Sequence, residues 1–428
     1  MSDLIVELVC LDCDNRYAGV QLRYRCDCGG TLDVRHDLAQ IKKRLSRDLF
    51  DDRRGCNNPV DRSGVWRFRE LILPVAEDQI VTRGEGNTFL YDTPSVAHYA
   101  GVDRLRLKHE GENPTGSFKD RGMTVGVTAA NVLKMERVAC ASTGNTSASM
   151  ASYAAIAGMR GFVFIPEGNI AYGKLSQALA YGSRTLQLAG DFDDAMRAVE
   201  QVCNSENIYL LNSINPFRIE GQKAIAFELL QDMNWEVPDW IVLPGGNLGN
   251  NSAISKGLQE LFDLGWIDRL PRLAVVQAAG ANPLYTAFAS GEPVRPMTAD
   301  TIATAIRIGD PVSWKKSLRG IAALNGVVTE VSDQEIVDAK AIVDAAGVGA
   351  EPASCATVAG LRRLVREGVI PADANICGIL TGHLLKDPDV VVNYHRGELK
   401  GFETPFANAP IQIEDNLEAI LEELRRDG

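Results

Sequence analysis

The chain has 428 residues and a formal net charge of −12 at neutral pH. Because a domain holds about 150 residues, this length predicts two or three lobes with room for a buried site. Hydrophobic residues make up 45% of the chain and charged residues 23%, a mixture typical of a soluble globular enzyme and unlike that of a disordered or membrane-spanning chain. Since an acidic protein repels nucleic-acid phosphates and anionic lipids, we expect a small-molecule ligand, no nucleic acid and no membrane.

The N-terminal segment, residues 1–36, contains two cysteine pairs, CLDC (Cys10, Cys13) and CDC (Cys26, Cys28). It has no basic region followed by a long apolar region and a cleavage site, so we expect a cytoplasmic protein. In a reducing compartment, clustered cysteines favour a metal site over disulfides. The spacing predicts a small cysteine ribbon, although its second turn is C-x-C instead of C-x-x-C. Structural zinc and four free thiols of a degenerate ribbon both remain open.

Residues 37–83 are charged and weakly periodic, which predicts a linker with one helix. Farther along the chain, short apolar runs alternate with helical patterns, and this alternation predicts an α/β fold with parallel-rich twisted sheets covered by helices. We expect a smaller lobe over residues 84–215 and a larger lobe over residues 216–428. In such sheets ligands bind beyond the carboxyl ends of the strands, so the loops there are the candidates for chemistry.

The first candidate loop contains the stretch ENPTGSFKDRG, in which Lys119 follows Phe118 at the predicted start of a helix. A lysine that is desolvated in a cleft loses its proton readily and can form a Schiff base with an aldehyde cofactor. An isolated lysine is far more often a solvated surface residue. The other loops decide between these two interpretations.

The second candidate loop, ASTGNTSAS at residues 141–149, places hydroxyls and an amide between a predicted strand and a predicted helix. One side chain among Ser142, Thr143 and Asn145 would be enough to cap that helix. The loop holds more polar groups than one helix end needs, so it predicts a pocket for a carboxylate or a phenolic oxygen.

The third candidate loop, NSINPFRIEGQK at residues 212–223, places Ser213, Asn215 and Arg218 at a strand end beside a helix that begins with proline. This is a suitable position for recognising a second anion with the forked guanidinium group. The alternative is that Arg218 is a solvated surface residue.

The fourth candidate loop, VLPGGNLGNNSA at residues 242–253, follows an apolar strand and opens a helix. Gly245, Gly246 and Gly249 allow the backbone amides to turn toward an anion, and the helix dipole adds to the attraction. The loop has neither a Walker lysine nor the dinucleotide fingerprint. The pattern therefore does not indicate binding of a nucleoside triphosphate or of NAD. Taken alone, the loop could also be a tight turn.

The last candidate loop, LTGHLLKDP at residues 380–388, places Thr381 at the end of an apolar strand. His383 follows, but a single histidine is more often structural than catalytic, and we do not assign it as a base. Pyridoxal phosphate needs a lysine, an anion cradle and partners for its phenolic oxygen and its ring nitrogen, and the five loops together supply these groups. The chain closes with an amphipathic helix in residues 411–428, which could cap a lobe or a partner subunit.

Taken together, these loops resemble those of the threonine synthases, in the fold-type II (tryptophan synthase β-like) class of pyridoxal phosphate enzymes. The resemblance covers most of the chain from residue 84 onward, and the cysteine pairs are similar to the ribbon of some bacterial and archaeal members. It implies a two-lobed fold-type II architecture. The matching blocks are GEGNT (84–88), ENPTGSFKDRG (112–122), STGNTSASMASYAA (142–155), KLSQALAYG (174–182), NSINPFRIEGQK (212–223), LPGGNLGN (243–250), TAIRIGDPVSWKK (304–316), EPASCATVAGL (351–361) and LTGHLLKDP (380–388).

The resemblance implies a cofactor role for each matching residue. Lys119 would carry pyridoxal phosphate as a Schiff base and move protons, with Phe118 packed beside the cofactor. Asn145 would contact the phenolic oxygen and Thr381 the ring nitrogen. The backbone amides expected to hold the cofactor phosphate are those of Gly245, Gly246, Asn247, Leu248 and Gly249.

The resemblance also implies the reaction of the family, in which O-phospho-L-homoserine and water become L-threonine and phosphate by γ-elimination and β-addition of water. Thr143, Asn145 and Thr146 would receive the carboxylate of the substrate, and Ser213 and Arg218 would bind its phosphate. Because relatives of this fold are usually dimers, we expect a homodimer.

Two residues depart from the family pattern, since Leu384 stands where a glycine is usual and Cys355 where an alanine is usual. We expect both near the cofactor, where a leucine could narrow the pocket or require different backbone angles. Two enzyme alternatives therefore stay open, a dehydratase of the same fold type that acts on threonine or serine and a repurposed paralogue of threonine synthase. A nucleic-acid or protein-binding module with an inactive enzyme body is disfavoured by the acidic charge and by the intact set of cofactor residues.

Overall fold

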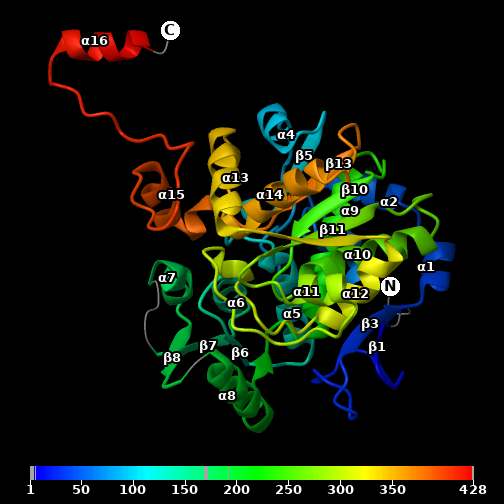
Figure 1. Cartoon of the computed structure of the whole chain (residues 1–428). Coiled ribbons are helices and arrows are strands. Elements are labelled where there is room, and N and C mark those ends of the chain that lie inside the picture. The colour runs from blue at the N-terminus through cyan, green and yellow to red at the C-terminus, as the bar shows by residue number, and fades with distance from the viewer. Residues whose placement is uncertain (1–3, 5, 168–171, 191, 427–428) are drawn as a thin grey trace.

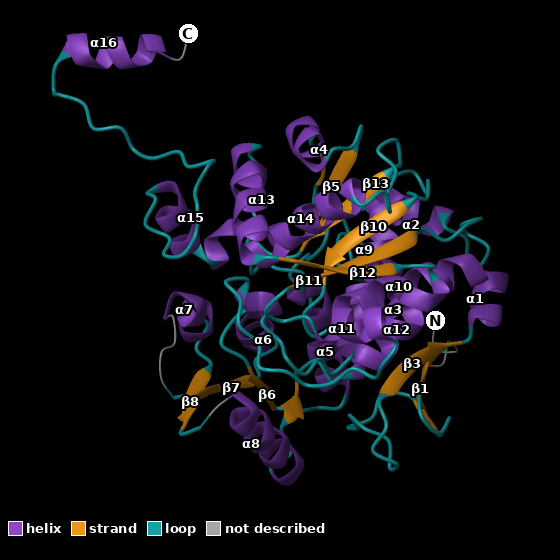
Figure 2. Cartoon of the chain, in the orientation of Figure 1, coloured by secondary structure: helices purple, strands orange, loops and turns teal. Residues whose placement is uncertain are grey.

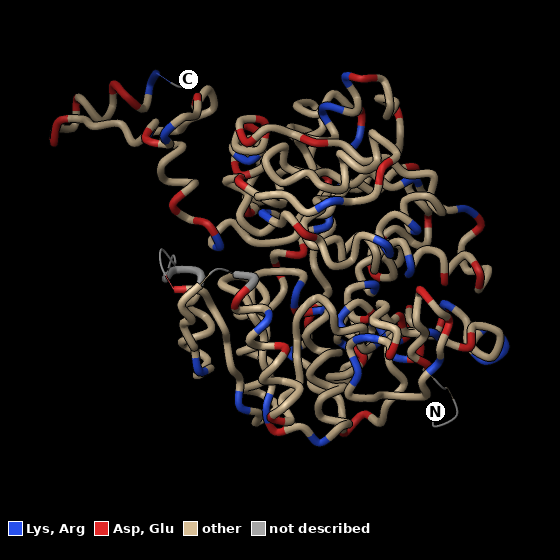
Figure 3. Tube along the Cα trace, turned by 60° about the horizontal axis from the view of Figure 1, so that its bottom comes forward, with Lys and Arg blue, Asp and Glu red and all other residues tan. Residues whose placement is uncertain are grey.

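The computed structural model describes residue 4 and residues 6–167, 172–190 and 192–426. Its strands form three separate sheets, and helices cover the two larger ones (Figure 1, Figure 2). In the described part of the chain, no helix combines the length and the apolar character that crossing a membrane requires. Acidic and basic residues alternate along the traces of both lobes, so the negative net charge does not come from one acidic tail (Figure 3).

The N-terminal ribbon is an antiparallel sheet in the order β2-β1-β3. Alternate residues of its two longer strands, Leu8 and Val34 among them, point into the main hydrophobic core, so the ribbon is packed on the body. The segment after the ribbon, expected to be a linker with one helix, contains three short α-helices instead. The elements of this region are β1 (Val6–Cys10), β2 (Arg16–Ala18), β3 (Leu32–His36), α1 (Leu38–Arg44), α2 (Asp48–Arg54) and α3 (Arg69–Ile72).

The larger sheet has six strands in the order β12-β11-β10-β13-β5-β4, and all neighbours are parallel except β4 and β5. The strands β4 and β5 fall within residues 84–215, so that stretch contributes to both sheets, and the lobe boundary expected at residue 84 does not follow the strand pairing. The strands are β4 (Leu90–Asp92), β5 (Leu105–His109), β10 (Trp240–Pro244), β11 (Arg272–Ala278), β12 (Val327–Val331) and β13 (Ile376–Leu380).

Successive residues of the central strands face two different cores. Ile241 and Leu243 of β10 point toward one core, while Val242 between them points toward the other. This alternation is the period of a strand that is buried on both faces, which explains why β10 is apolar throughout. The helices on the two faces are α4 (Pro94–Ala100), α13 (Asp333–Ala345) and α14 (Pro352–Arg366) on one side, and α9 (Pro216–Asp232), α10 (Gly249–Asp263) and α12 (Trp314–Ala323) on the other.

The smaller sheet has four parallel strands in the order β8-β7-β6-β9. Ala139 and Phe164 pack against the helix α8, and Val138 and Val163 pack on the opposite face against the main core. The elements are β6 (Arg137–Ala141), β7 (Arg160–Pro166), β8 (Arg184–Leu188), β9 (Tyr209–Leu210), α5 (Lys119–Val132), α6 (Asn145–Ile156), α7 (Tyr172–Ala180) and α8 (Phe192–Ser205).

A buried ion network joins the helix α9 to the lysine loop. The Glu228 carboxylate of α9 accepts bonds from Lys108 Nζ at 2.8 Å, Arg121 Nη2 at 2.7 Å and Arg67 Nη2 at 2.8 Å. Arg121 also donates through Nε to Glu110 at 2.6 Å. These charges hold α5 and α9 in register next to the ends of the strands.

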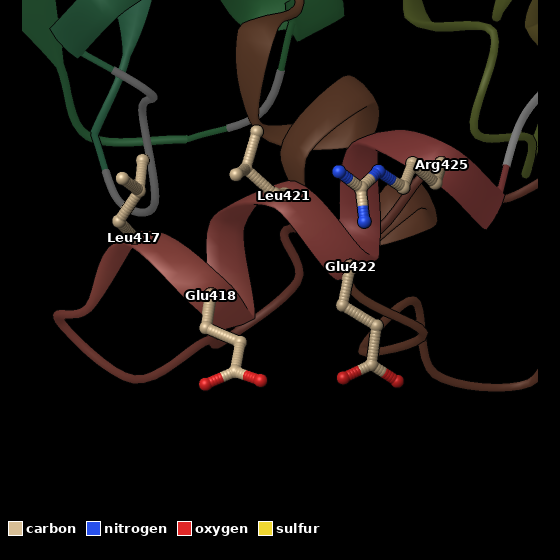
Figure 4. A pocket seen from close by; sticks show the side chains of 5 residues that line it. All are labelled: Leu417, Glu418, Leu421, Glu422 and Arg425. Carbon is tan, nitrogen blue, oxygen red and sulfur yellow. The ribbon is translucent and has the colours of Figure 1, made fainter.

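The C-terminal segment leaves the body after α15 (Pro388–His395) and ends in α16 (Leu417–Arg426), which lies away from both lobes (Figure 1). Leu417 and Leu421 point to one side of α16 and Glu418 and Glu422 to the other, as the sequence pattern predicts (Figure 4). A groove beside these residues is lined by α16 alone. It contains none of the expected site residues. The remaining α-helix of the described residues is α11 (Pro283–Ser290).

Candidate active site

A cleft of about 1090 Å³ lies where the strands of the two larger sheets end. All five candidate loops reach it, although they come from β5, β6, β9, β10 and β13, which are far apart in the sequence. The expected residues that line it are Phe118, Lys119, Thr143, Asn145, Thr146, Ser213, Arg218, Gly246, Asn247, Leu248, Gly249 and Thr381. The structure therefore brings together every expected cofactor and substrate residue except Gly245.

Gly245 differs from the expectation for a physical reason. Its amide donates to the carbonyl oxygen of Val276 at 2.7 Å, as an extension of the pairing between β10 and β11. A Cβ atom at this position would lie 2.6 Å from Cγ1 of Val275. Gly245 is a glycine because the strand end is crowded, and its amide is not available to a phosphate.

Lys119 is the first residue of α5, and its loop is attached to the end of β13. The amide of Phe118 donates to the carbonyl oxygen of Thr381 at 3.0 Å, and Ser117 pairs with Gly382. The Lys119 side chain is half-buried and its Nζ lies 4.4 Å from the centre of the Phe118 ring. The backbone of the lysine loop is thereby fixed beside the end of β13.

The environment of Lys119 makes its ammonium group lose a proton more readily than that of an ordinary lysine. Burial and, to a lesser extent, the nearby Arg218 guanidinium lower the pKa of Lys119 to about 7, against a smaller opposing effect of Glu351. Water reaches the side chain through the cleft, yet the surrounding protein is dense enough to disfavour the ammonium form. A lysine in this state is partly uncharged at neutral pH and can act as a nucleophile. This environment favours the Schiff-base interpretation of Lys119 over the solvated-lysine alternative.

The residue after the lysine fixes the start of α5. Asp120 is buried and accepts hydrogen bonds from the amide of Thr115 at 2.7 Å, the hydroxyl of Thr115 at 2.6 Å and the hydroxyl of Ser149 at 2.6 Å. Burial outweighs these bonds and raises the pKa of Asp120 to about 6. Since Ser149 belongs to α6, Asp120 connects the lysine loop to the polar loop that precedes α6.

The glycine loop after β10 offers free donors at the start of a 15-residue helix. Within the described residues, the amides of Gly246, Asn247 and Leu248 donate no hydrogen bond. Leu248 has a φ of 62°, so its backbone is left-handed whereas the helix that follows is right-handed. Unpaired amides at a helix N-terminus are the arrangement that binds phosphate.

Asn247 connects the glycine loop to two other segments. Its Oδ1 accepts from the amide of Val312 at 2.8 Å, and its Nδ2 donates to the hydroxyl of Ser213 at 3.2 Å. The loop that carries the expected substrate-phosphate residue Ser213 is therefore adjacent to the loop expected to hold the cofactor phosphate.

Arg218 lies in the first turn of α9 and is 1% exposed. Its Nη1 donates to the carbonyl oxygen of Leu211 at 2.9 Å, but Nε and Nη2 have no hydrogen-bond partner in the described structure. Burial lowers the pKa of Arg218 to about 10. The solvated alternative for Arg218 is wrong, and a buried guanidinium with two unsatisfied nitrogen atoms indicates a site for an anion.

Several cleft residues were missed by the sequence analysis. Glu351, directly before Pro352 of α14, is 1% exposed and accepts a hydrogen bond from Asn145 Nδ2 at 3.0 Å. Gln222 Oε1 and both polar atoms of the Asn250 side chain also lack partners among the described residues. An acidic residue ahead of a proline-started helix was the available signal for Glu351, whereas Gln222 and Asn250 lie within otherwise ordinary helical patterns.

The two departures from the family pattern do not enter the cleft. Leu384 packs on Gly349, where a Cβ would lie 2.3 Å from Leu384 Cδ2, and its backbone is not left-handed. Cys355 is fully buried in the core around α14, with its thiol 3.8 Å from the carbonyl oxygen of Ala350. Neither residue lines the cleft, so neither has the expected effect on the pocket. His383 is at the rim, where its Nδ1 accepts from the amide of Leu385 at 3.2 Å in a local turn.

The four ribbon cysteines form a compact cluster outside the cleft. The Sγ atoms of Cys10 and Cys28 are 3.6 Å apart and those of Cys13 and Cys26 are 3.5 Å apart, and all four sulfurs lie within 4.8 Å of one another. Disulfide sulfurs would be separated by about 2.05 Å. Four thiolates around zinc, at Zn–S distances of about 2.3 Å, would be about 3.8 Å apart, so the cluster has the dimensions of a zinc site.

Comparisons with known proteins agree with this geometry. A family model described as pyridoxal-phosphate dependent enzyme matches residues 81–382. The threonine synthase of Methanocaldococcus jannaschii is 46% identical over 394 residues, which cover 91% of this chain and 95% of that protein. The threonine synthase of Methanosarcina acetivorans is 45% identical, covering 97% of this chain and 98% of that protein.

Among solved structures, maize serine racemase matches 70% of this chain and 88% of its own with a TM-score of 0.61. Its sequence identity of 22% limits this likeness to the fold. The predicted fold class and the family resemblance are both confirmed. The chain belongs to the pyridoxal-phosphate-dependent enzyme family and, within it, to the threonine synthases.

Proposed function

We propose that this chain converts O-phospho-L-homoserine and water into L-threonine and phosphate with bound pyridoxal phosphate. The observation that carries the proposal is Arg218, a buried guanidinium with two unpaired nitrogens, in the same cleft as a lysine with a pKa of about 7. One anion site at the glycine loop suits the cofactor phosphate, and a second at Arg218 suits a phosphorylated substrate.

The residues present fit the cofactor. The free amides of Gly246, Asn247 and Leu248 can hold its phosphate, and the Lys119 amine can bind its aldehyde carbon. Asn145 and Thr381 both line the cleft, which supports their proposed roles as partners for the phenolic oxygen and the ring nitrogen. When bound, pyridoxal phosphate withdraws electrons from the carbon atoms of an attached amino acid.

The chain's own groups would then bind the substrate and move its protons. Ser213 and Arg218 would bind the phosphate that leaves from the γ-carbon, and Thr143 and Thr146 would bind the carboxylate. Once its amine is free, Lys119 can accept a proton at neutral pH and return it, because its ammonium form is disfavoured there.

The second candidate function is a dehydratase that acts on L-threonine or L-serine. Such an enzyme also needs Lys119 and the glycine loop, but it has no use for Arg218 as an anion site. The experiment is incubation with O-phospho-L-homoserine and measurement of threonine and inorganic phosphate. We expect one phosphate per threonine, and we expect Arg218→Met to form both products far more slowly. Release of ammonia and a keto acid from L-threonine, with no phosphate from the phosphorylated substrate, would establish the dehydratase instead.

We also propose that Cys10, Cys13, Cys26 and Cys28 bind one structural zinc ion. The compact sulfur cluster supports this, and the ribbon is bonded to the body through Lys315 of α12, whose Nζ donates to Asp12 at 2.8 Å. Metal analysis of the purified protein should find about one zinc per chain, lost in Cys13→Ser. The control is Cys56→Ser, because Cys56 is an exposed cysteine outside the ribbon. Full zinc in Cys13→Ser would contradict the proposal.

The remaining expectations join this proposal. We infer a cytoplasmic homodimer that binds no nucleic acid, supported by the acidic charge and by the amphipathic α16 that packs on neither lobe of its own chain. Light scattering of the full chain measures the oligomeric state, and a monomer at micromolar concentration would contradict the dimer.

A further inference from the structure

Glu351 is a buried residue whose side chain lines the cleft. It precedes α14, its amide donates to the carbonyl oxygen of Gly382 at 3.0 Å, and its side chain faces Gly382 so closely that a Cβ there would lie 2.4 Å from Oε1. The N-terminus of a 15-residue helix is a favourable place for a negative charge. The hydrogen bond to Gly382 fixes the backbone of Glu351 beside the end of β13.

The carboxylate contacts both residues expected beside the cofactor ring. Asn145 Nδ2 lies 3.0 Å from Oε2 and 3.3 Å from Oε1, and the Thr381 hydroxyl lies 3.4 Å from Oε1. Thr381 is also 3.0 Å from the hydroxyl of Ser354. Glu351 thus lies between two side chains that come from different lobes and different loops.

The contact with Asn145 decides which way its amide faces. An ionised carboxylate can only accept hydrogen bonds, so it requires the NH₂ end of the amide and rejects the oxygen end. The NH₂ group has two hydrogens, and one engaged by Glu351 leaves the other for a second acceptor in the cleft. Without a neighbouring group that can only accept hydrogen bonds, the two orientations of the Asn145 amide would be close in energy.

We propose that Glu351 is a positioning residue of this active site, which orients the Asn145 amide so that an N–H group is presented to the ring oxygen of the cofactor. This inference rests on the proposed function because it requires pyridoxal phosphate in the cleft. It concerns a residue of this chain to which the proposed function gives no role.

The test is a double-mutant cycle on the holoenzyme with Glu351→Gln, Asn145→Ala and the double variant. The readouts are the visible absorption maximum of the bound cofactor and its dissociation constant, measured by equilibrium dialysis. We expect cofactor binding to weaken about tenfold in Asn145→Ala, as the loss of a hydrogen bond to a charged group would produce. Glu351→Gln should weaken cofactor binding by a smaller factor and shift the absorption maximum in the same direction. The double variant should have the same dissociation constant and absorption maximum as Asn145→Ala alone.

Two controls keep the inference falsifiable. Glu367→Gln changes an exposed glutamate at the other end of α14 and should leave the band and the affinity unchanged. Glu351→Asp keeps the negative charge at the helix N-terminus, but its side chain is one methylene shorter and its carboxylate lies farther from Asn145. It should therefore shift the absorption band as Glu351→Gln does. If Glu351→Asp retains the parental band, the charge alone matters and positioning is wrong.

Losses that multiply in the double variant, or an unchanged band in Glu351→Gln, overturn the inference. The proposed function fails separately, if borohydride reduction of the parental holoenzyme labels a peptide that lacks Lys119. The two failures are distinguishable because the labelling experiment involves no change at Glu351.

Discussion

The helix α9 has buried cations near both of its ends, and the two groups behave in opposite ways. Near its C-terminal end, Glu228 is bonded to Lys108, Arg121 and Arg67, and these paired charges raise the pKa of Arg121 and hold that of Glu228 far below its usual range. At its N-terminal end, Arg218 keeps two unpaired nitrogens beside a lysine whose pKa is lowered to about 7.

The difference separates structural charges from functional ones. A buried ion that is fully bonded holds helices together, and breaking one bond leaves an uncompensated charge. A buried cation without partners is destabilising by itself, so it indicates an anionic ligand that supplies the missing bonds. Four predictions test this contrast between the Glu228 network and the cleft.

The largest effect is expected from Lys119→Ala. This variant should lose at least about 1,000-fold in kcat, because both the attachment of the cofactor and the proton transfer depend on one amine. Its thermal melting temperature should stay near that of the parent protein, since a destabilised ammonium is removed. Phosphate release and differential scanning fluorimetry measure the two quantities, and substantial turnover would refute the role of Lys119.

Glu228→Gln should chiefly affect stability. Removing the carboxylate leaves the buried cations of Lys108, Arg121 and Arg67 without their shared partner, so we expect the free energy of unfolding to fall by about 3–5 kcal/mol. Urea denaturation followed by circular dichroism provides the measurement. A loss below about 1 kcal/mol, the range of a surface ion pair, would show that the network is not a structural clamp.

Arg218→Met should show the opposite pattern. We expect kcat/KM for O-phospho-L-homoserine to fall about 100-fold, as for the loss of two charge-assisted hydrogen bonds. The free energy of unfolding without ligands should be unchanged or higher, because an unpaired buried charge is replaced by an apolar side chain. A parallel loss of stability would place Arg218 with the structural cations.

The smallest effect is a pH dependence. Because only the uncharged amine attacks an aldehyde, the rate of cofactor uptake by the apoenzyme should rise about tenfold per pH unit below the Lys119 pKa and level off above about 7. Since the pKa of Lys119 is lower in the folded than in the unfolded chain, its contribution to apoenzyme stability should increase as pH rises above 7. Stopped-flow absorbance checks the rate, and a plateau beginning only near pH 10 would contradict a lowered pKa.

Several features of the site could be predicted because they are local. The glycines after an apolar strand, the lysine in ENPTGSFKDRG and the paired cysteines each depend on residues within a few positions of one another. The parallel sheets followed from the alternation of apolar runs and helices. These patterns reflect backbone geometry and burial, which act on neighbouring residues along the chain.

Other features depended on distant parts of the chain. β5 pairs with β13, which follows it by more than 250 residues, and β4 joins the sheet through β5, so the sheet that they join could not be read from their own composition. Gly245 resembled a phosphate donor until its pairing with Val276 was known. Glu351 received no role from the sequence, because only folding brings it next to Asn145.

By itself, the sequence determined which chemical groups this protein has and which local conformations they adopt: an activatable lysine, a glycine turn at a helix N-terminus and clustered thiols. Only the tertiary structure decided which polar groups are satisfied, because a hydrogen-bond partner can come from any segment that folding brings near. That distinction separates Arg121, fully bonded and structural, from Arg218, which is unpaired and faces the cleft.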